Sequence, residues 1–137
     1  MQRLKTRLQF QAALAGGTVS RTPHFALHRL NLPENRPGAS GEVSGAQGAP
    51  LFHSIDVWLG AMVPKRWAKR AVTRNAIKRQ IYAVSSQFEV RMPCAAHVVR
   101  LRSGFDRQQF ISATSPLLKL AVRQELEQLF ERAANKP

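Results

Sequence analysis

The stretch that most constrains the fold of this chain is residues 57–88, where one repeating pattern of side chains gives way to another. Its first part alternates between two sets of residues, Val57, Leu59, Ala61 and Val63 against Trp58, Gly60 and Met62. This two-residue period predicts a strand, which Pro64 ends because proline has no amide hydrogen for the ladder. From about residue 68 the spacing becomes helical, and the apolar residues form one stripe: Ile77, Ile81, Val84 and Phe88.

The other side of this predicted helix, together with the turn before it, is cationic. No acidic residue lies between Asp56 and Glu89, whereas seven basic residues do: Lys65, Arg66, Lys69, Arg70, Arg74, Lys78 and Arg79. A surface that needs only solubility carries charges of both signs, and like charges repel one another unless a polyanion neutralises them. We therefore predict that this surface binds nucleic acid.

The composition supports a single folded domain with a polyanionic partner. The chain has 137 residues, a hydrophobic content of 44% and a formal net charge of +13. No apolar run approaches the ~18 residues that a membrane span needs, so we expect no membrane partner. The single cysteine, Cys94, excludes an internal disulfide and suits the cytoplasm.

Two more helices are predicted from their termini. Residues 7–15 are expected to form the first, because Thr6 and Gln9 have the spacing of a capping box and a glycine pair follows. The last helix is expected to begin where Pro116 follows Ser115, a cap residue followed by a proline at the first helical position.

Further strands are expected at residues 18–22, 25–30 and 96–101. Three prolines and four glycines fall within residues 33–50, so the segment at about 33–51 is predicted to be a flexible loop. The whole pattern predicts an α+β fold, a single α/β sandwich domain over residues 1–137 with the element order α-β-β-β-α-β-α.

The sequence contains no evident catalytic or metal centre. A nuclease that acts alone needs clustered carboxylates or a histidine acid–base pair. His24 and His28 are four residues apart, but on a strand this separates them by about 13 Å, too far to share a metal ion. We therefore expect a binding protein with no catalytic residue and no metal ligand of its own.

The strand-to-helix stretch resembles the signature of the bacterial ribonuclease P protein subunit. In that family a strand with Leu-Gly and Val-Pro/Ser-Lys-Lys/Arg leads into a helix with Arg-Asn-Arg-Ile-Lys-Arg. The matching residues are Leu59, Gly60, Val63, Pro64, Lys65 and Arg66, then Ala71, Val72, Arg74, Asn75, Ile77, Lys78 and Arg79. Ala76 departs from the pattern, because it stands where the family usually has an arginine, and we predict that Ala76→Arg would slightly strengthen RNA binding.

The resemblance implies a subunit of an endoribonuclease ribonucleoprotein that removes the 5′ leader of precursor tRNA. The RNA subunit would be the catalyst and would hold Mg²⁺, whereas the protein would bind no cofactor alone and need no obligate protein partner. The implied RNA contacts are Lys65, Arg66, Lys69, Arg70, Arg74, Asn75, Lys78 and Arg79. The implied leader cleft contains Phe10 and, less directly, Phe25. The resemblance also implies a mixed sheet of about four strands with a left-handed β-α-β crossover, against the general right-handed rule.

Two other functions fit the same charge. A ribosomal or RNA-chaperone protein would also be basic, without affecting tRNA maturation. A DNA-binding regulator would insert the basic helix into a major groove, with Arg74 and Asn75 reading bases, but no partner helix of a helix-turn-helix motif precedes it.

Overall fold

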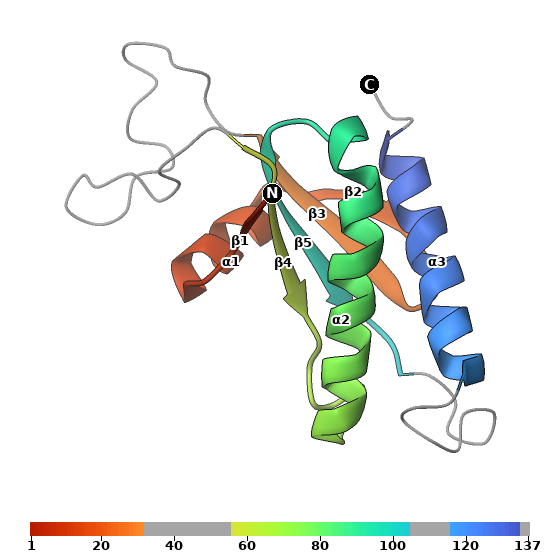
Figure 1. Ribbon diagram of the computed structural model, residues 1–137. Coiled ribbons are helices and arrows are strands. Elements are labelled where there is room, and N and C mark those ends of the chain that lie inside the picture. Colours follow the sequence, from red (N-terminus) through yellow and green to blue (C-terminus); the bar gives the residue numbers. More distant parts are fainter. Residues whose placement is uncertain (32–55, 105–115, 135–137) are drawn as a thin grey trace, which may run out of the picture.

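The computed structural model describes residues 1–31, 56–104 and 116–134, and it places a mixed five-stranded sheet between helices that cover both of its faces (Figure 1). The elements in chain order are β1 (Gln2–Arg3), α1 (Arg7–Ala15), β2 (Thr18–Arg21), β3 (Phe25–Asn31), β4 (Trp58–Met62), α2 (Ala71–Phe88), the 3-10 helix η1 (Glu89–Arg91), β5 (Ala95–Leu101) and α3 (Pro116–Ala134). The predicted α+β class is confirmed.

The strands lie in the order β1-β4-β5-β3-β2. β1 pairs with β4, and β4 with β5, in parallel, whereas β5 pairs with β3, and β3 with β2, in the antiparallel direction. Helix α2 connects the neighbouring parallel strands β4 and β5. In Figure 1 both strands run downward, α2 lies in front of them and β5 lies to the right of β4. This is the left-handed crossover that the resemblance implied.

The alternation of side chains along the strands divides the core into two layers. Beneath α2 and α3, one face of the sheet packs a large apolar cluster that includes Phe25, Leu27, Leu59, Ile81, Val99, Leu101 and Leu126. Beneath α1, the opposite face packs a smaller cluster of Leu4, Ala13, Trp58, Ala96 and Val98, with the half-buried Phe10 against it. The two long helices also meet each other, where the rings of Phe88 and Phe130 stack with centroids 5.7 Å apart.

The first helix begins as its sequence predicts. The Thr6 hydroxyl accepts a hydrogen bond from the Gln9 amide at 3.1 Å, and the Gln9 side chain accepts from the Thr6 amide at 3.2 Å. This reciprocal capping box satisfies two amide donors that the helix itself leaves unpaired. After the helix, Gly17 adopts a φ of 102°, a conformation that glycine reaches without a steric penalty.

Two features differ from the sequence-based expectations. The sheet has five strands rather than about four, because residues 2–3 form an edge strand before the first helix. Helix α2 begins at Ala71 rather than near residue 68, because the amides of Trp67 and Ala68 both bond to the Pro64 carbonyl and form a separate turn. The predicted loop at about 33–51 and the predicted cap Ser115 lie outside the described residues. Within the described ranges, no helix has the length and apolar character needed to cross a bilayer.

Candidate nucleic-acid interface

The turn between β4 and α2 presents four of the predicted cations to solvent: Lys65, Arg66, Lys69 and Arg70 are all exposed. Arg66 lies over the ring of Trp67, with 5.3 Å between the guanidinium carbon and the ring centroid. Arg70 is the N-cap residue of α2, and its side chain makes no capping hydrogen bond. The positive end of the helix dipole therefore adds to the charge of the turn, which favours an anionic ligand here.

Arg74 holds this turn against the first residues of α2. Its Nη1 donates to the carbonyl oxygens of Lys69 at 2.8 Å and Ala68 at 3.1 Å. The half-buried guanidinium is thus used in part for structure. This contact fixes the turn with its exposed cations beside the start of α2. We call the cations of the turn and of α2, from Lys65 to Arg79, the basic surface.

The remaining predicted side chains line a pocket along α2. Asn75, Lys78 and Arg79 lie one helical turn or less apart, and the pocket beside them has a volume of about 600 Å³. Its other polar lining comes from Tyr82 and Ser86 of the same helix and from Arg3 of β1. None of the described residues that line this pocket is acidic, so the site suits an anion. We call it the α2 pocket.

The two phenylalanines of the expected leader cleft lie on opposite faces of the sheet. Phe10 on α1 is half buried and packs over Gly60, where an added Cβ would lie 2.5 Å from its Cε1 atom. Phe25 on β3 has an exposed fraction of 0% and belongs to the cluster under α2 and α3. Phe25 therefore cannot line a surface shared with Phe10, and this part of the prediction is corrected.

The face of the sheet that α1 covers also carries polar side chains. His28 on β3 approaches Thr18 Oγ1 through Nδ1 at 3.3 Å, and its Nε2 accepts from Arg100 Nε at 3.4 Å. Burial, and then the charges of Arg100 and Arg21, lower the pKa of His28, so its ring is neutral at pH 7. The positive charge on this side is therefore that of the arginines, of which Arg21 is exposed and Arg100 half exposed.

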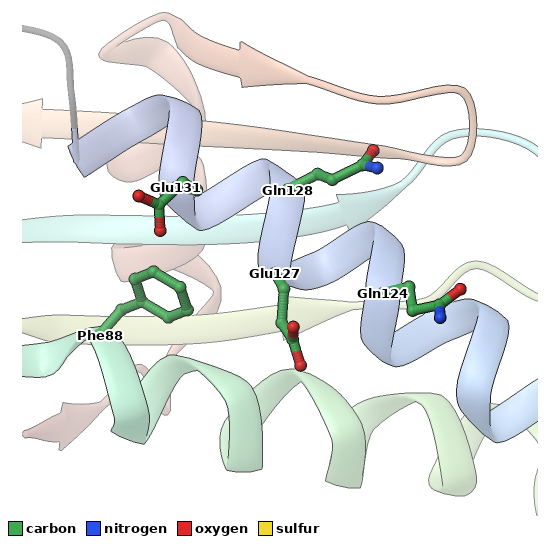
Figure 2. Close-up of a pocket in the computed structure, with 5 residues that line it drawn as sticks. All are labelled: Phe88, Gln124, Glu127, Gln128 and Glu131. Atoms are coloured by element: carbon green, nitrogen blue, oxygen red, sulfur yellow. The ribbon is translucent and has the colours of Figure 1, made fainter.

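A second groove, between the later turns of α2 and α3, has the opposite character (Figure 2). It has a volume of about 480 Å³ and is lined by Phe88, Gln124, Glu127, Gln128 and Glu131. Arg91 donates two hydrogen bonds to Glu131, at 2.9 and 3.0 Å, which lowers the pKa of Glu131 and raises that of Arg91. Because this groove carries two carboxylates, it suits an anionic ligand less well than the α2 pocket does.

In the part of the chain that the structure describes, no group of three or more His, Cys, Asp or Glu side chains has the geometry to hold a metal ion. Cys94 is exposed and is not part of any such cluster among those residues. The chemistry that these residues offer is the binding of anions through cations, amides and an aromatic ring.

A comparison with known protein families shows to which family the chain belongs. The family model described as Ribonuclease P matches residues 1–134 of the chain. The chain belongs to the ribonuclease P protein family. A ribonuclease P protein component from Ralstonia pickettii is 32% identical over 134 residues, covering 96% of this chain and 78% of that protein. Another from Nostoc is 29% identical over 128 residues, covering 93% and 85%.

The fold agrees with this membership. A solved structure of the Staphylococcus aureus RNase P protein superposes with a TM-score of 0.66, covering 97% of this chain and 95% of that one, at 19% sequence identity. As a member of the ribonuclease P protein family, the chain is a component of an endoribonuclease ribonucleoprotein that acts in tRNA processing, and its ribonucleoprotein supplies an RNA partner.

Sequence reasoning placed the family's basic residues on one surface but missed Arg3 and the pairing that brings it there. A two-residue strand has no periodicity to detect, and its partner β4 lies far along the chain. Ala76 also differs from its sequence-based interpretation. Its exposed fraction is 7%, so the site at which the family usually has an arginine is closed in this chain.

Proposed function

We propose that the chain binds the catalytic RNA subunit of ribonuclease P through the basic surface, and precursor tRNA through the α1 face of the sheet. The observation that carries the proposal is the basic surface from Lys65 to Arg79, together with the α2 pocket, in which none of the described lining residues is acidic. Phosphate groups supply most of the affinity of proteins for nucleic acids, and cations on one surface bind them.

On this proposal the protein contributes binding rather than bond cleavage. Two RNA molecules repel one another, and a cationic protein between them lowers the salt concentration that their association needs. The Mg²⁺ ions that activate water would be held by RNA, and the protein would need no cofactor and no obligate protein partner. We place the complex in the cytoplasm, where precursor tRNA is processed in bacteria.

The RNA-subunit part of the proposal is tested with Lys78→Gln and Arg79→Gln together. The double variant should bind ribonuclease P RNA more weakly, and the slope of log K against log salt should fall by about 0.7–0.9 for each phosphate that the protein no longer neutralises. The matched control is Arg123→Gln with Arg132→Gln on α3, which removes the same charge far from the α2 pocket. Equal losses of affinity in both double variants would show that only net charge matters.

The leader part is tested with Phe10→Ala. If the Phe10 ring stacks on a base, the variant should lose ~1–3 kcal/mol of affinity for precursor tRNA and almost none for mature tRNA. Leu8→Ala, an exposed position on the same helix, is the control. Thermal melts must accompany the binding data, because Phe10 also packs on the sheet. A loss of affinity that is equal for both tRNAs would make Phe10 a packing residue only.

Cleavage assays separate this proposal from a general RNA-binding function. The protein alone should leave precursor tRNA intact, and it should stimulate cleavage at the mature 5′ end when ribonuclease P RNA is present at low Mg²⁺. Binding of RNA without any effect on this cleavage would favour a ribosomal or chaperone function.

A further inference from the structure

We propose that Arg3, stacked on Tyr82, is a phosphate-binding residue of the α2 pocket, contributed by an element outside the arginine-rich helix. This inference rests on the proposed RNA-binding function and adds to it a cation from the edge strand β1. The ligand is a phosphodiester group of RNA bound between Arg3 on one side and Lys78 and Arg79 on the other.

The pairing of β1 with β4 sets the direction of the Arg3 side chain. The Gln2 amide donates to the Val57 carbonyl at 2.8 Å, and the Leu4 amide donates to the Leu59 carbonyl at 2.9 Å. Leu4 packs in the cluster under α1, on the face of the sheet opposite α2. Because successive side chains of a strand point to opposite faces, Arg3 points toward α2.

Tyr82 holds the Arg3 guanidinium over its ring. The guanidinium carbon lies 4.0 Å from the ring centroid, the distance of a stacked cation–π contact. Tyr82 is itself half buried against the main core, so the platform is rigid. A guanidinium held in this way loses less conformational freedom on binding a phosphate than a free side chain would.

The cations of the α2 pocket are not neutralised within the described part of the chain. Arg3, Lys78 and Arg79 form no ion pair with any carboxylate of those residues, whereas Arg91 and Arg123 pair with Glu131 and Glu127 on α3. Three like charges around one pocket are unfavourable until an anion enters. The pocket therefore has the features of a binding site rather than of a solvated salt-bridge surface.

The stacking also favours a phosphate over a base. The guanidinium covers one face of the Tyr82 ring, so a base cannot stack on that face without displacing Arg3. The guanidinium still presents its N–H groups at the edge, where they suit phosphate oxygens in a paired geometry.

The inference is tested with Arg3→Gln and the ribonuclease P RNA encoded in the same genome. We expect about a fivefold loss of affinity near 0.1 M salt and a salt slope smaller by about 0.7–0.9. Arg7→Gln, an equal change of charge at an exposed position on α1, is the matched control and should have a much smaller effect. Arg3→Lys should restore the slope, because it keeps the charge.

The second variant tests the platform. Tyr82→Leu keeps an apolar side chain against the core and all three cations, but it removes the ring under Arg3. It should weaken RNA binding with little change in the salt slope, and its effect should vanish in the Arg3→Gln background. Melting temperatures identify any variant that is destabilised. If Arg3→Gln is destabilised, the Tyr82→Leu and Arg3→Lys results decide.

The outcomes distinguish this inference from the proposed function. If Arg3→Gln behaves like Arg7→Gln while Lys78→Gln with Arg79→Gln weakens binding, Arg3 is not a ligand and the proposed function stands. If none of these variants changes RNA binding, the proposed RNA-binding surface is itself wrong.

Discussion

The buried His97 on β5 should make the stability of this protein depend on pH. The carbonyl oxygen of Trp58 lies 3.1 Å from Nδ1 and accepts its hydrogen, while Nε2 accepts a hydrogen bond from Arg29 Nε at 3.0 Å. The neutral ring fits both partners. Burial, and then the positive charge of Arg29, oppose a second proton and lower the pKa of His97 from 6.5 to about 4.

The sign and size of the effect follow from linkage. In the unfolded chain His97 takes up a proton as the pH falls below about 6.5, whereas in the folded chain it resists protonation until about pH 4. The stabilisation due to the neutral ring is complete above pH 6.5 and is lost progressively between pH 6.5 and 4. At ~1.4 kcal/mol per pH unit, the loss is on the order of 3 kcal/mol.

Urea unfolding at several pH values, followed through tryptophan fluorescence, to which the buried Trp58 contributes, measures this loss. His97→Gln is the control, because glutamine can still accept from Arg29 but does not titrate. Carboxylates and the other histidines titrate in both proteins, so their contributions cancel in the comparison. The free energy of unfolding of the wild type should exceed that of the variant at pH 7.5, and the gap should narrow by about 3 kcal/mol by pH 4. A gap that stays constant over this range would falsify the assignment.

Three further substitutions test side-chain packing at two positions and the hydrogen bonds between α3 and the β2–β3 turn. Gly60→Ala places a Cβ 2.5 Å from Phe10 Cε1, so we expect overpacking to cost ~1–3 kcal/mol in denaturant unfolding, and an unchanged midpoint would contradict the contact. Ala76→Arg inserts a long cation at a position that is 7% exposed, so we now expect a lower free energy of unfolding instead of stronger RNA binding. Tighter RNA binding without a loss of stability would support the sequence-based prediction instead. Glu125→Ala removes the carboxylate that accepts, at 2.8 Å each, from a hydroxyl and a backbone amide of the β2–β3 turn. It should cost ~1–3 kcal/mol, whereas Glu127→Ala, at a half-exposed position on the same helix, should be close to neutral.

The sequence alone determined the local elements and the kind of surface they carry. The bounds of α1 and the capping box of Thr6 and Gln9 were predicted correctly, because both depend on contacts within a few residues. The change from a strand to a helix in residues 57–88 was likewise readable, since the two periods differ. The basic character of α2 required only the order of charges along the chain, and the family signature lies in the same stretch.

Only the tertiary structure decided which side chains share a surface. The resemblance implied a leader cleft with Phe10 and, less directly, Phe25. The sheet separates the two rings, because β3 directs Phe25 toward α2 and α3 while α1 packs Phe10 on the other face. Ala76 became a closed position only when α2 was packed into the fold.

The α2 pocket is the clearest case of a site that the sequence could not reveal. Arg3 lies beside Lys78 and Arg79 only because the two-residue strand β1 pairs with β4. Along the chain, the first helix and two further strands separate β1 from β4. Such pairing depends on hydrogen bonds between backbones that are distant in sequence, and backbone donors and acceptors are the same in every residue except proline. Periodicity and charge order therefore specify what a segment is, whereas packing specifies what it touches.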